Sequence, residues 1–202
     1  GASNTAVGAY SLKENLDGGS NVAVGVSALK NNISGTRNIA IGYGAYDNAD
    51  AEDDNLAIGH DALGGAIAGG VKNIAIGNYS LDANTSGINN TAIGYDAMTT
   101  NIGGDKNTSV GFQSLQANTE GNKNVAVGMY SMYANTTAAD NVAVGYESMK
   151  VNTTGTRNIA IGYGAYDAAD TESDNLAIGY DAMTTNIGGD KNTSVGFQSL
   201  QA

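Results

Sequence analysis

The chain has 202 residues, with 29 glycines and no proline, cysteine or tryptophan. The lack of cysteine excludes a disulfide scaffold and a thiolate metal site. A formal net charge of −11 argues against binding to nucleic acid or to an anionic membrane surface, because both need a basic patch. No apolar run approaches the roughly 18 residues of a membrane span, so we expect no direct membrane insertion.

A repeat of 17 residues runs through the whole chain. Counted from an asparagine, twelve units begin at positions 4, 21, 38, 55, 73, 90, 107, 124, 141, 158, 175 and 192. The spacing from Asn55 to Asn73 is 18, and its extra residue falls in the Gly-rich stretch 64–70, where we expect a turn. We therefore expect residues 1–202 to form one repetitive segment of a longer fibre.

Each unit reads N-x-A-[VI]-G-x-x-[AS]-[LMY], and most units continue with x-x-N-x-x-G. Large and small residues alternate over the first five positions, which is the period of a β-strand. A glycine in every unit disfavours helix, and no sustained heptad indicates a coiled coil. In chain order, the expected strand segments are 4–8, 21–25, 38–42, 55–59, 73–77, 90–94, 107–111, 124–128, 141–145, 158–162, 175–179 and 192–196.

Turns follow the strands in the segments 15–18, 32–35, 84–87, 118–121 and 152–155, which share the pattern N-x-x-G. Asparagine starts such a turn by bonding its own backbone, and we expect the glycine to adopt the positive φ that ends it. A 17-residue period of short strands and turns matches one coil of a β-solenoid. The sequence thus predicts an all-β parallel solenoid of twelve rungs, about 55 Å long at an interstrand spacing of about 4.8 Å.

The asparagine at position one occurs in every unit. We expect its amide to stack on the same residue in the rungs above and below, forming a hydrogen-bonded ladder. The alternative is a row of amides that binds a glycan. The expected ladder comprises Asn21, Asn38, Asn55, Asn73, Asn90, Asn107, Asn124, Asn141, Asn158 and Asn175.

Only positions four and nine are large and apolar in every unit, and we expect both to point inward. The expected core at position four comprises Val24, Ile41, Ile58, Ile76, Ile93, Val110, Val127, Val144, Ile161 and Ile178. Small residues at positions three, five and eight cannot cover a core alone, but they allow another backbone to approach closely. We therefore expect a flattened roll in which several chains, three in the simplest case, pack these small faces around a common axis.

The segments 21–25, 38–42, 124–128 and 158–162, for example Asn21-Val22-Ala23-Val24-Gly25, resemble the N-S-V-A-I-G repeats in head domains of YadA-type trimeric autotransporter adhesins. The longer unit with its N-x-x-G turn also resembles repeats of bacteriophage tail-fibre and adhesin-like proteins. This resemblance implies a left-handed parallel β-roll, a side-by-side homotrimer, and an extracellular location on a cell surface or virion. It further implies a shaft or adhesive role, with a receptor or glycan as partner. The family's repeat is shorter than the unit of this chain.

Few residues could carry chemistry. His60 is the only histidine, so neither a Ser-His-Asp triad nor a zinc site can be assembled, and we expect no catalytic residue and no organic cofactor. Two carboxylate clusters could hold calcium through oxygen ligands, although neither follows a known calcium-loop spacing; the alternative is a solvated acidic turn. Their members are Asp47, Asp50, Glu52, Asp53 and Asp54, and Asp167, Asp170, Glu172 and Asp174.

Aromatic residues recur at position six and would form a stripe along the rod. An exposed stripe could contact a sugar or a surface; the alternative is that the rings pack over neighbouring rungs or across a chain interface. The expected stripe comprises Tyr43, Tyr95, Phe112, Tyr146, Tyr163 and Tyr180.

Whole-rung duplication favours a mechanical role for the chain. Residues 92–117 recur without change as residues 177–202, and such copying lengthens a rod without altering any type of contact. We therefore expect a non-enzymatic fibre or adhesin segment that acts as a stiff spacer. Two alternatives stay open: an ice- or crystal-surface-binding solenoid, suggested by the small residues at positions three, five and eight, and a self-assembling extracellular filament.

Overall fold

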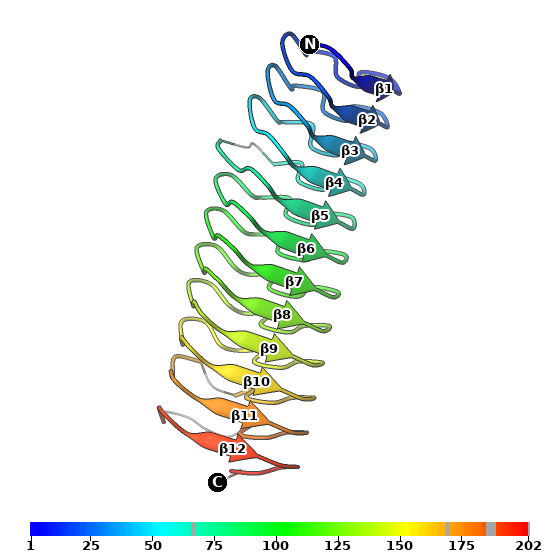
Figure 1. Ribbon diagram of the computed structural model, residues 1–202. Coiled ribbons are helices and arrows are strands. Elements are labelled where there is room, and N and C mark those ends of the chain that lie inside the picture. Colours follow the sequence, from blue (N-terminus) through cyan, green and yellow to red (C-terminus); the bar gives the residue numbers. More distant parts are fainter. Residues whose placement is uncertain (66–67, 169, 185–188, 202) are drawn as a thin grey trace.

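The computed structural model describes residues 1–65, 68–168, 170–184 and 189–201. Within these ranges the chain forms no helix and has one three-residue strand at positions two to four of every unit (Figure 1). The strands are β1 (Thr5–Val7), β2 (Val22–Val24), β3 (Ile39–Ile41), β4 (Leu56–Ile58), β5 (Ile74–Ile76), β6 (Thr91–Ile93), β7 (Thr108–Val110), β8 (Val125–Val127), β9 (Val142–Val144), β10 (Ile159–Ile161), β11 (Leu176–Ile178) and β12 (Thr193–Val195).

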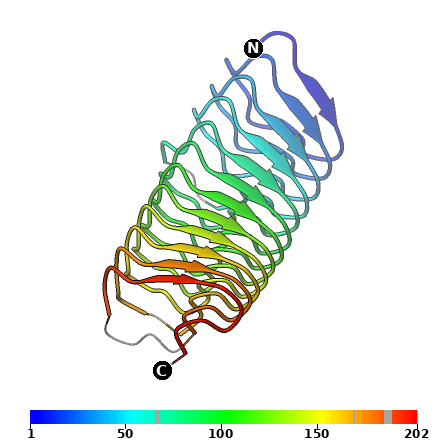
Figure 2. The ribbon, with the colours of Figure 1, turned by 60° about the horizontal axis from the view of Figure 1, so that its bottom comes forward.

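All twelve strands belong to one parallel sheet, in chain order from β1 to β12. Each strand pairs with the equivalent strand of the next unit, as in the register Thr108↔Val125. The strands lie side by side along one wall of the coil, and turns close the rest (Figure 2). The predicted all-β parallel solenoid with one unit per rung is thus confirmed.

The 18-residue unit leaves the sheet undisturbed. β4 and β5 keep the standard register, Leu56↔Ile74, so the extra residue is absorbed outside the strands. Residues 66 and 67 of the Gly-rich stretch lie outside the described residues.

The interior is filled from positions three, eight and nine, so the expected inward orientation of position four is wrong. In unit two, Ala23, Ala28 and Leu29 are completely buried, whereas both outer residues of a strand such as Ile39–Ile41 face outward. None of the position-four residues named as core is buried: Val24, Ile41, Ile58, Ile76, Ile93, Val110, Val127, Val144, Ile161 and Ile178. Position nine does point inward.

The cause of this inversion is a narrow interior. The Ser131 hydroxyl at position eight donates to the carbonyl of Ala143, which is position three of the next rung, at 3.2 Å. Ser148 makes the same bond to Ala160 at 2.9 Å. Positions three and eight therefore face each other across a gap that accepts only Ala or Ser, and a β-branched side chain must turn outward. The small residues at positions three and eight, which were expected to face partner chains, belong instead to the core of each rung.

Two asparagine ladders run along the rod. At position one, the side-chain oxygen of Asn21 accepts from the backbone N–H of Asn38 at 2.8 Å, and its Nδ2 donates to the carbonyl of Gly35 at 2.8 Å. This ladder thus runs mainly through the backbone, and the expected amide-to-amide contact occurs at three intervals, for example from Nδ2 of Asn107 to Oδ1 of Asn90 at 3.2 Å. Direct amide contacts instead dominate at position twelve, where Asn118 donates to Asn101 at 2.7 Å. The N-x-x-G pattern predicts only a turn role for that position.

The glycine at position five allows a close approach between successive rungs of one chain. Gly128 has a φ of +134°, and a Cβ atom there would lie 2.2 Å from the carbonyl oxygen of Gly145. The glycine of the N-x-x-G turn differs, because Gly121 does not have the expected positive φ. A Cβ atom on Gly121 would instead collide with the Asn118 and Asn135 amides. Positive φ falls on non-glycine residues such as Asp96, Met98 and Lys106, at positions seven, nine and seventeen.

Candidate functional site

The outer wall of the sheet is apolar. Because positions two and four point outward, two rows of mainly Val, Ile and Thr run along the rod on either side of the buried alanines. The exposed fraction is 38% for Ile41, 41% for Ile159 and 39% for Ile161. This face forms a regular hydrophobic surface along the sheet.

A second exposed feature follows the strands directly, at position six. All six residues of the expected aromatic stripe are exposed, and their rings also contact rings of neighbouring rungs, so exposure and rung packing occur together. The contacts continue without a break from unit three to unit twelve. We call this set the aromatic row: Tyr43, His60, Tyr79, Tyr95, Phe112, Tyr130, Tyr146, Tyr163, Tyr180 and Phe197.

Two members of the row come from position seven. Tyr79 and Tyr130 enter where position six holds Asn78 and Met129, and each contacts the ring of the next rung edge-on. Neither tyrosine belongs to the stripe predicted from the sequence, although a tyrosine directly after each gap in that stripe was the available signal. The rings of Tyr146, Tyr163, Tyr180 and Phe197 are instead nearly parallel, with successive centroid distances of 5.0, 5.0 and 5.3 Å.

Charge is distributed unequally on the two sides of the sheet. Position seventeen, just before each strand, carries three aspartates and six of the nine basic residues: Asp54, Asp140 and Asp174, and Arg37, Lys72, Lys106, Lys123, Arg157 and Lys191. Position seven, beside the aromatic row, carries the carboxylates Asp61, Asp96, Glu147 and Asp181. Partial burial and the Glu147 carboxylate raise the pKa of Tyr146.

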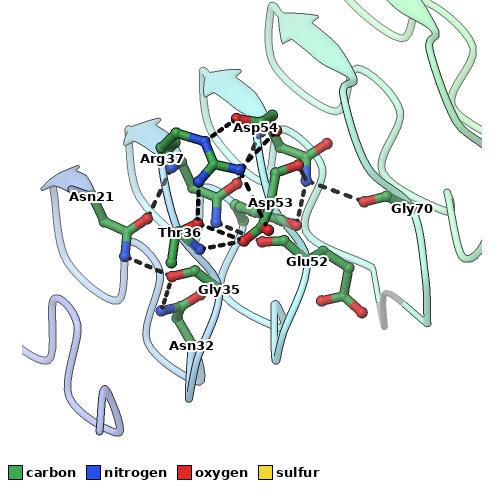
Figure 3. A network of polar contacts seen from close by, with 12 residues as sticks. Asn21, Asn32, Gly35, Thr36, Arg37, Glu52, Asp53, Asp54 and Gly70 are labelled. Carbon is green, nitrogen blue, oxygen red and sulfur yellow. Dashed lines mark hydrogen bonds and ion pairs between the residues drawn. The ribbon is translucent and has the colours of Figure 1, made fainter. Parts of the chain in front are cut away.

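The acidic cluster of unit three is held by hydrogen bonds and ion pairs (Figure 3). Arg37 pairs with both oxygens of Asp54, at 2.5 and 3.0 Å, and this hydrogen-bonded contact lowers the pKa of Asp54. Asp53 accepts from the backbone N–H and hydroxyl of Thr36. Glu52 accepts from two backbone N–H groups of its own turn and from Gly69. These carboxylates therefore already serve the turns and neighbouring rungs.

Unit ten repeats this arrangement. Arg157 pairs with Asp174 at 2.6 and 2.9 Å, and Glu172 accepts from the N–H groups of Asp170 and Thr171. In the described ranges, no group of three or more His, Cys, Asp or Glu side chains is placed to hold a metal ion. Asp47 and Asp167 lie apart from the ion pairs, and partial burial raises the pKa of each.

A buried exchange explains why these two units differ. Tyr46 takes position nine in place of Leu or Met, Ala49 takes position twelve in place of Asn, and Glu52 takes position fifteen in place of Gly. The Tyr46 hydroxyl lies 2.7 Å from Nδ2 of Asn55 and accepts its hydrogen bond. Tyr166 makes the same contact with Asn175. The glutamate in this turn thus occurs together with a larger core side chain at position nine and a smaller side chain at position twelve.

The surface of the described residues has no enclosed pocket. Among the same residues, no helix is long and apolar enough to cross a membrane. Comparison of the chain with protein-family models, curated proteins and solved structures gives no match. The apolar sheet face and the aromatic row are therefore the candidate functional surfaces, and both are elongated along the rod.

Proposed function

We propose that the chain is a non-enzymatic segment of an extracellular fibre or adhesin, of the phage tail-fibre or YadA-like type, that serves as a stiff spacer. The observation that carries this proposal is the unbroken repetition of one rung, with every strand paired in the same register to the next. Load along the rod then passes from each rung to the next through equivalent backbone hydrogen bonds. A left-handed coil on a cell surface or virion belongs to the same proposal.

The active form in this proposal is a side-by-side homotrimer. The apolar rows at positions two and four support it, since a contiguous apolar face of this length on a soluble chain marks an interaction surface. A second copy presents the same rows at the same axial spacing, so three parallel sheets can cover one another around an axis. This replaces the small-residue contacts expected from the sequence, because those residues are buried within each chain.

Analytical ultracentrifugation combined with light scattering tests the trimer. The expected result for the wild-type chain is an elongated particle of three times the chain mass. Because Ile161 faces outward, Ile161→Asp should dissociate the trimer while the far-ultraviolet circular dichroism of each chain is kept. Ser86→Asp, an exposed substitution outside the sheet, is the matched control. A compact wild-type monomer, or a trimer that survives Ile161→Asp, contradicts the proposal.

The ice- or crystal-binding alternative loses the observation that favoured it. Its motivation was a surface formed by small residues at positions three, five and eight, and positions three and eight are buried in the described rungs. The exposed rows at positions two and four vary between Thr, Val, Ile and Leu. Thermal hysteresis measurements check this alternative directly, and an activity that scales with concentration would restore it.

A further inference from the structure

The aromatic row has a geometry that selects its ligands. Its four C-terminal rings, Tyr146, Tyr163, Tyr180 and Phe197, are inclined to their neighbours by only 13°, 7° and 18°. Their exposed fractions are 38%, 47%, 45% and 71%. Each inner ring thus has both faces covered by the rings of the adjacent rungs, while its edge faces solvent.

This arrangement disfavours a sugar ring as ligand. A pyranose stacks on a free aromatic face, and within the stack such faces are occupied by neighbouring rings. What the row offers instead is a continuous hydrophobic strip that runs along the rod axis and repeats at each rung. A flat, elongated molecule can lie lengthwise on this strip and contact several ring edges together.

The charges beside the row select a cation. Glu147 and Asp181 directly follow Tyr146 and Tyr180. Six of the nine basic residues lie instead at position seventeen on the other side of the sheet, where several pair with aspartates of the same position. The protein itself places one cation on the row: the Lys150 ammonium lies 5.7 Å from the Tyr130 ring centroid and 2.7 Å from a Glu147 oxygen. Ring and carboxylate thus already hold a cation together at one point.

We propose that the aromatic row is a binding site for elongated planar aromatic cations, which lie along the rod axis over the rings from Tyr146 to Phe197. The rings supply the apolar strip, and Asp181 supplies the counter-charge, since Glu147 is already paired with Lys150. The site is formed within one chain and does not depend on the fibre proposal or on the trimer. It acts by reversible binding and needs no covalent step.

Thioflavin T, a planar aromatic cation, is the probe. Titration into the intact wild-type protein, followed by fluorescence and by isothermal calorimetry, should show saturable binding that weakens as salt is added. Tyr163→Ala/Tyr180→Ala should weaken binding about tenfold or more, because two central rings of the strip are lost. Asp181→Asn should weaken it roughly twofold, an effect typical of one exposed charge. Asparagine suits the positive φ of this position.

Matched controls locate the site. Tyr10 is an exposed tyrosine of the first rung outside the row, so Tyr10→Ala should leave binding unchanged. Ile161→Thr tests the apolar sheet face and should also have no effect. The proposal is overturned if the wild type does not bind, if the double variant binds like the wild type, or if Ile161→Thr removes binding. Equal affinity for a planar aromatic anion contradicts the charge assignment. Circular dichroism verifies folding, and Tyr163→Leu/Tyr180→Leu replaces the double variant if it unfolds.

Discussion

Replacing the position-five glycine of one central rung tests most directly how closely the backbones of neighbouring rungs pack. In Gly128→Ala, the new methyl group would lie 2.2 Å from the carbonyl oxygen of Gly145 and 2.6 Å from its carbonyl carbon. Both are backbone atoms, so no side chain can rotate away. The Gly145 N–H also bonds the Val127 carbonyl at 2.8 Å, and any separation of the rungs weakens this ladder.

The expected cost combines two effects. An alanine at a φ of +134° adds about 1–3 kcal/mol of backbone strain. Moving packed backbone to relieve the contact adds about 1–3 kcal/mol more. For a chain of this length, each kcal/mol lowers Tm by roughly 2–4 °C, so we expect Gly128→Ala to melt about 10 °C below the wild type.

Thermal melting followed by circular dichroism measures this shift, and hydrogen exchange locates it to the rungs around β8 and β9. Gly164→Asn is the matched control, because a Cβ atom at Gly164 meets only the side-chain oxygen of Asp181. Other rungs place Glu147 or Asp181 at this position with a similar φ, so we expect a change within about 1 kcal/mol. If Gly128→Ala melts within about 2 °C of the wild type, the inference that the backbones of neighbouring rungs leave no room for a methyl group at Gly128 is wrong.

Three further predictions concern the interior and the carboxylates. Asn118→Ala leaves the Asn135 donor and the Asn101 acceptor unpaired, and should cost about 2–5 kcal/mol in chemical denaturation; a cost below 1 kcal/mol contradicts the position-twelve ladder. In unit three, Tyr46→Leu alone should lower the free energy of unfolding by about 2–4 kcal/mol. The triple variant Tyr46→Leu/Ala49→Asn/Glu52→Gly should instead be within about 1 kcal/mol of the wild type in chemical denaturation. If the costs of the three substitutions simply add, the three residues are not linked. The third prediction concerns pH. The pKa values of Asp47 and Asp167 are raised in the folded chain, so the free energy of unfolding should rise as pH falls from 7 and these carboxylates become protonated. The pKa values of Asp54 and Asp174 are lowered, so the free energy of unfolding should decline again at pH below about 4. Melting profiles between pH 2 and 8 check this maximum. Asp47→Asn/Asp167→Asn should be more stable than the wild type at pH 7 and show a smaller rise, which Asp82 with its raised pKa keeps in part.

The period of the repeat was sufficient to predict the architecture. A constant spacing of 17 residues, with strand alternation in each unit, leaves few folds other than a solenoid, and the kept register at Leu56↔Ile74 shows that the single insertion belongs to a connection. The buried position of Leu29 and Met98 could also be predicted, because position nine holds a large residue, Leu, Met or Tyr, in every unit.

The orientation of the strands could not be read from alternation alone. A pattern such as Ile39-Ala40-Ile41 has one large and one small face, and the preference of large apolar residues for the interior suggests that isoleucine points inward. The outcome depends on the width of the coil, which is set by contacts between positions three and eight of successive rungs. The width of the coil depends on the turns, where residues such as Met98 adopt a positive φ. The residue type of Met98 gives no indication of that conformation. The turns also explain why the aromatic row has no gap at unit five. Tyr79, at position seven, contacts the rings of His60 and Tyr95, which are both at position six.

The hydrogen bonds between rungs also determine how the rod responds to tension. They run along its axis, from each rung to the next, so a pull on the two ends loads them in series and the weakest rung opens first. One opened rung frees 17 residues, which extend to roughly 55–60 Å, against a spacing of about 4.8 Å while folded. At unit three, Ala49 interrupts the amide ladder above Asn32, so the position-twelve ladder adds no resistance across that interval. Under force the stiff rod becomes an extensible tether that lengthens by one rung at a time.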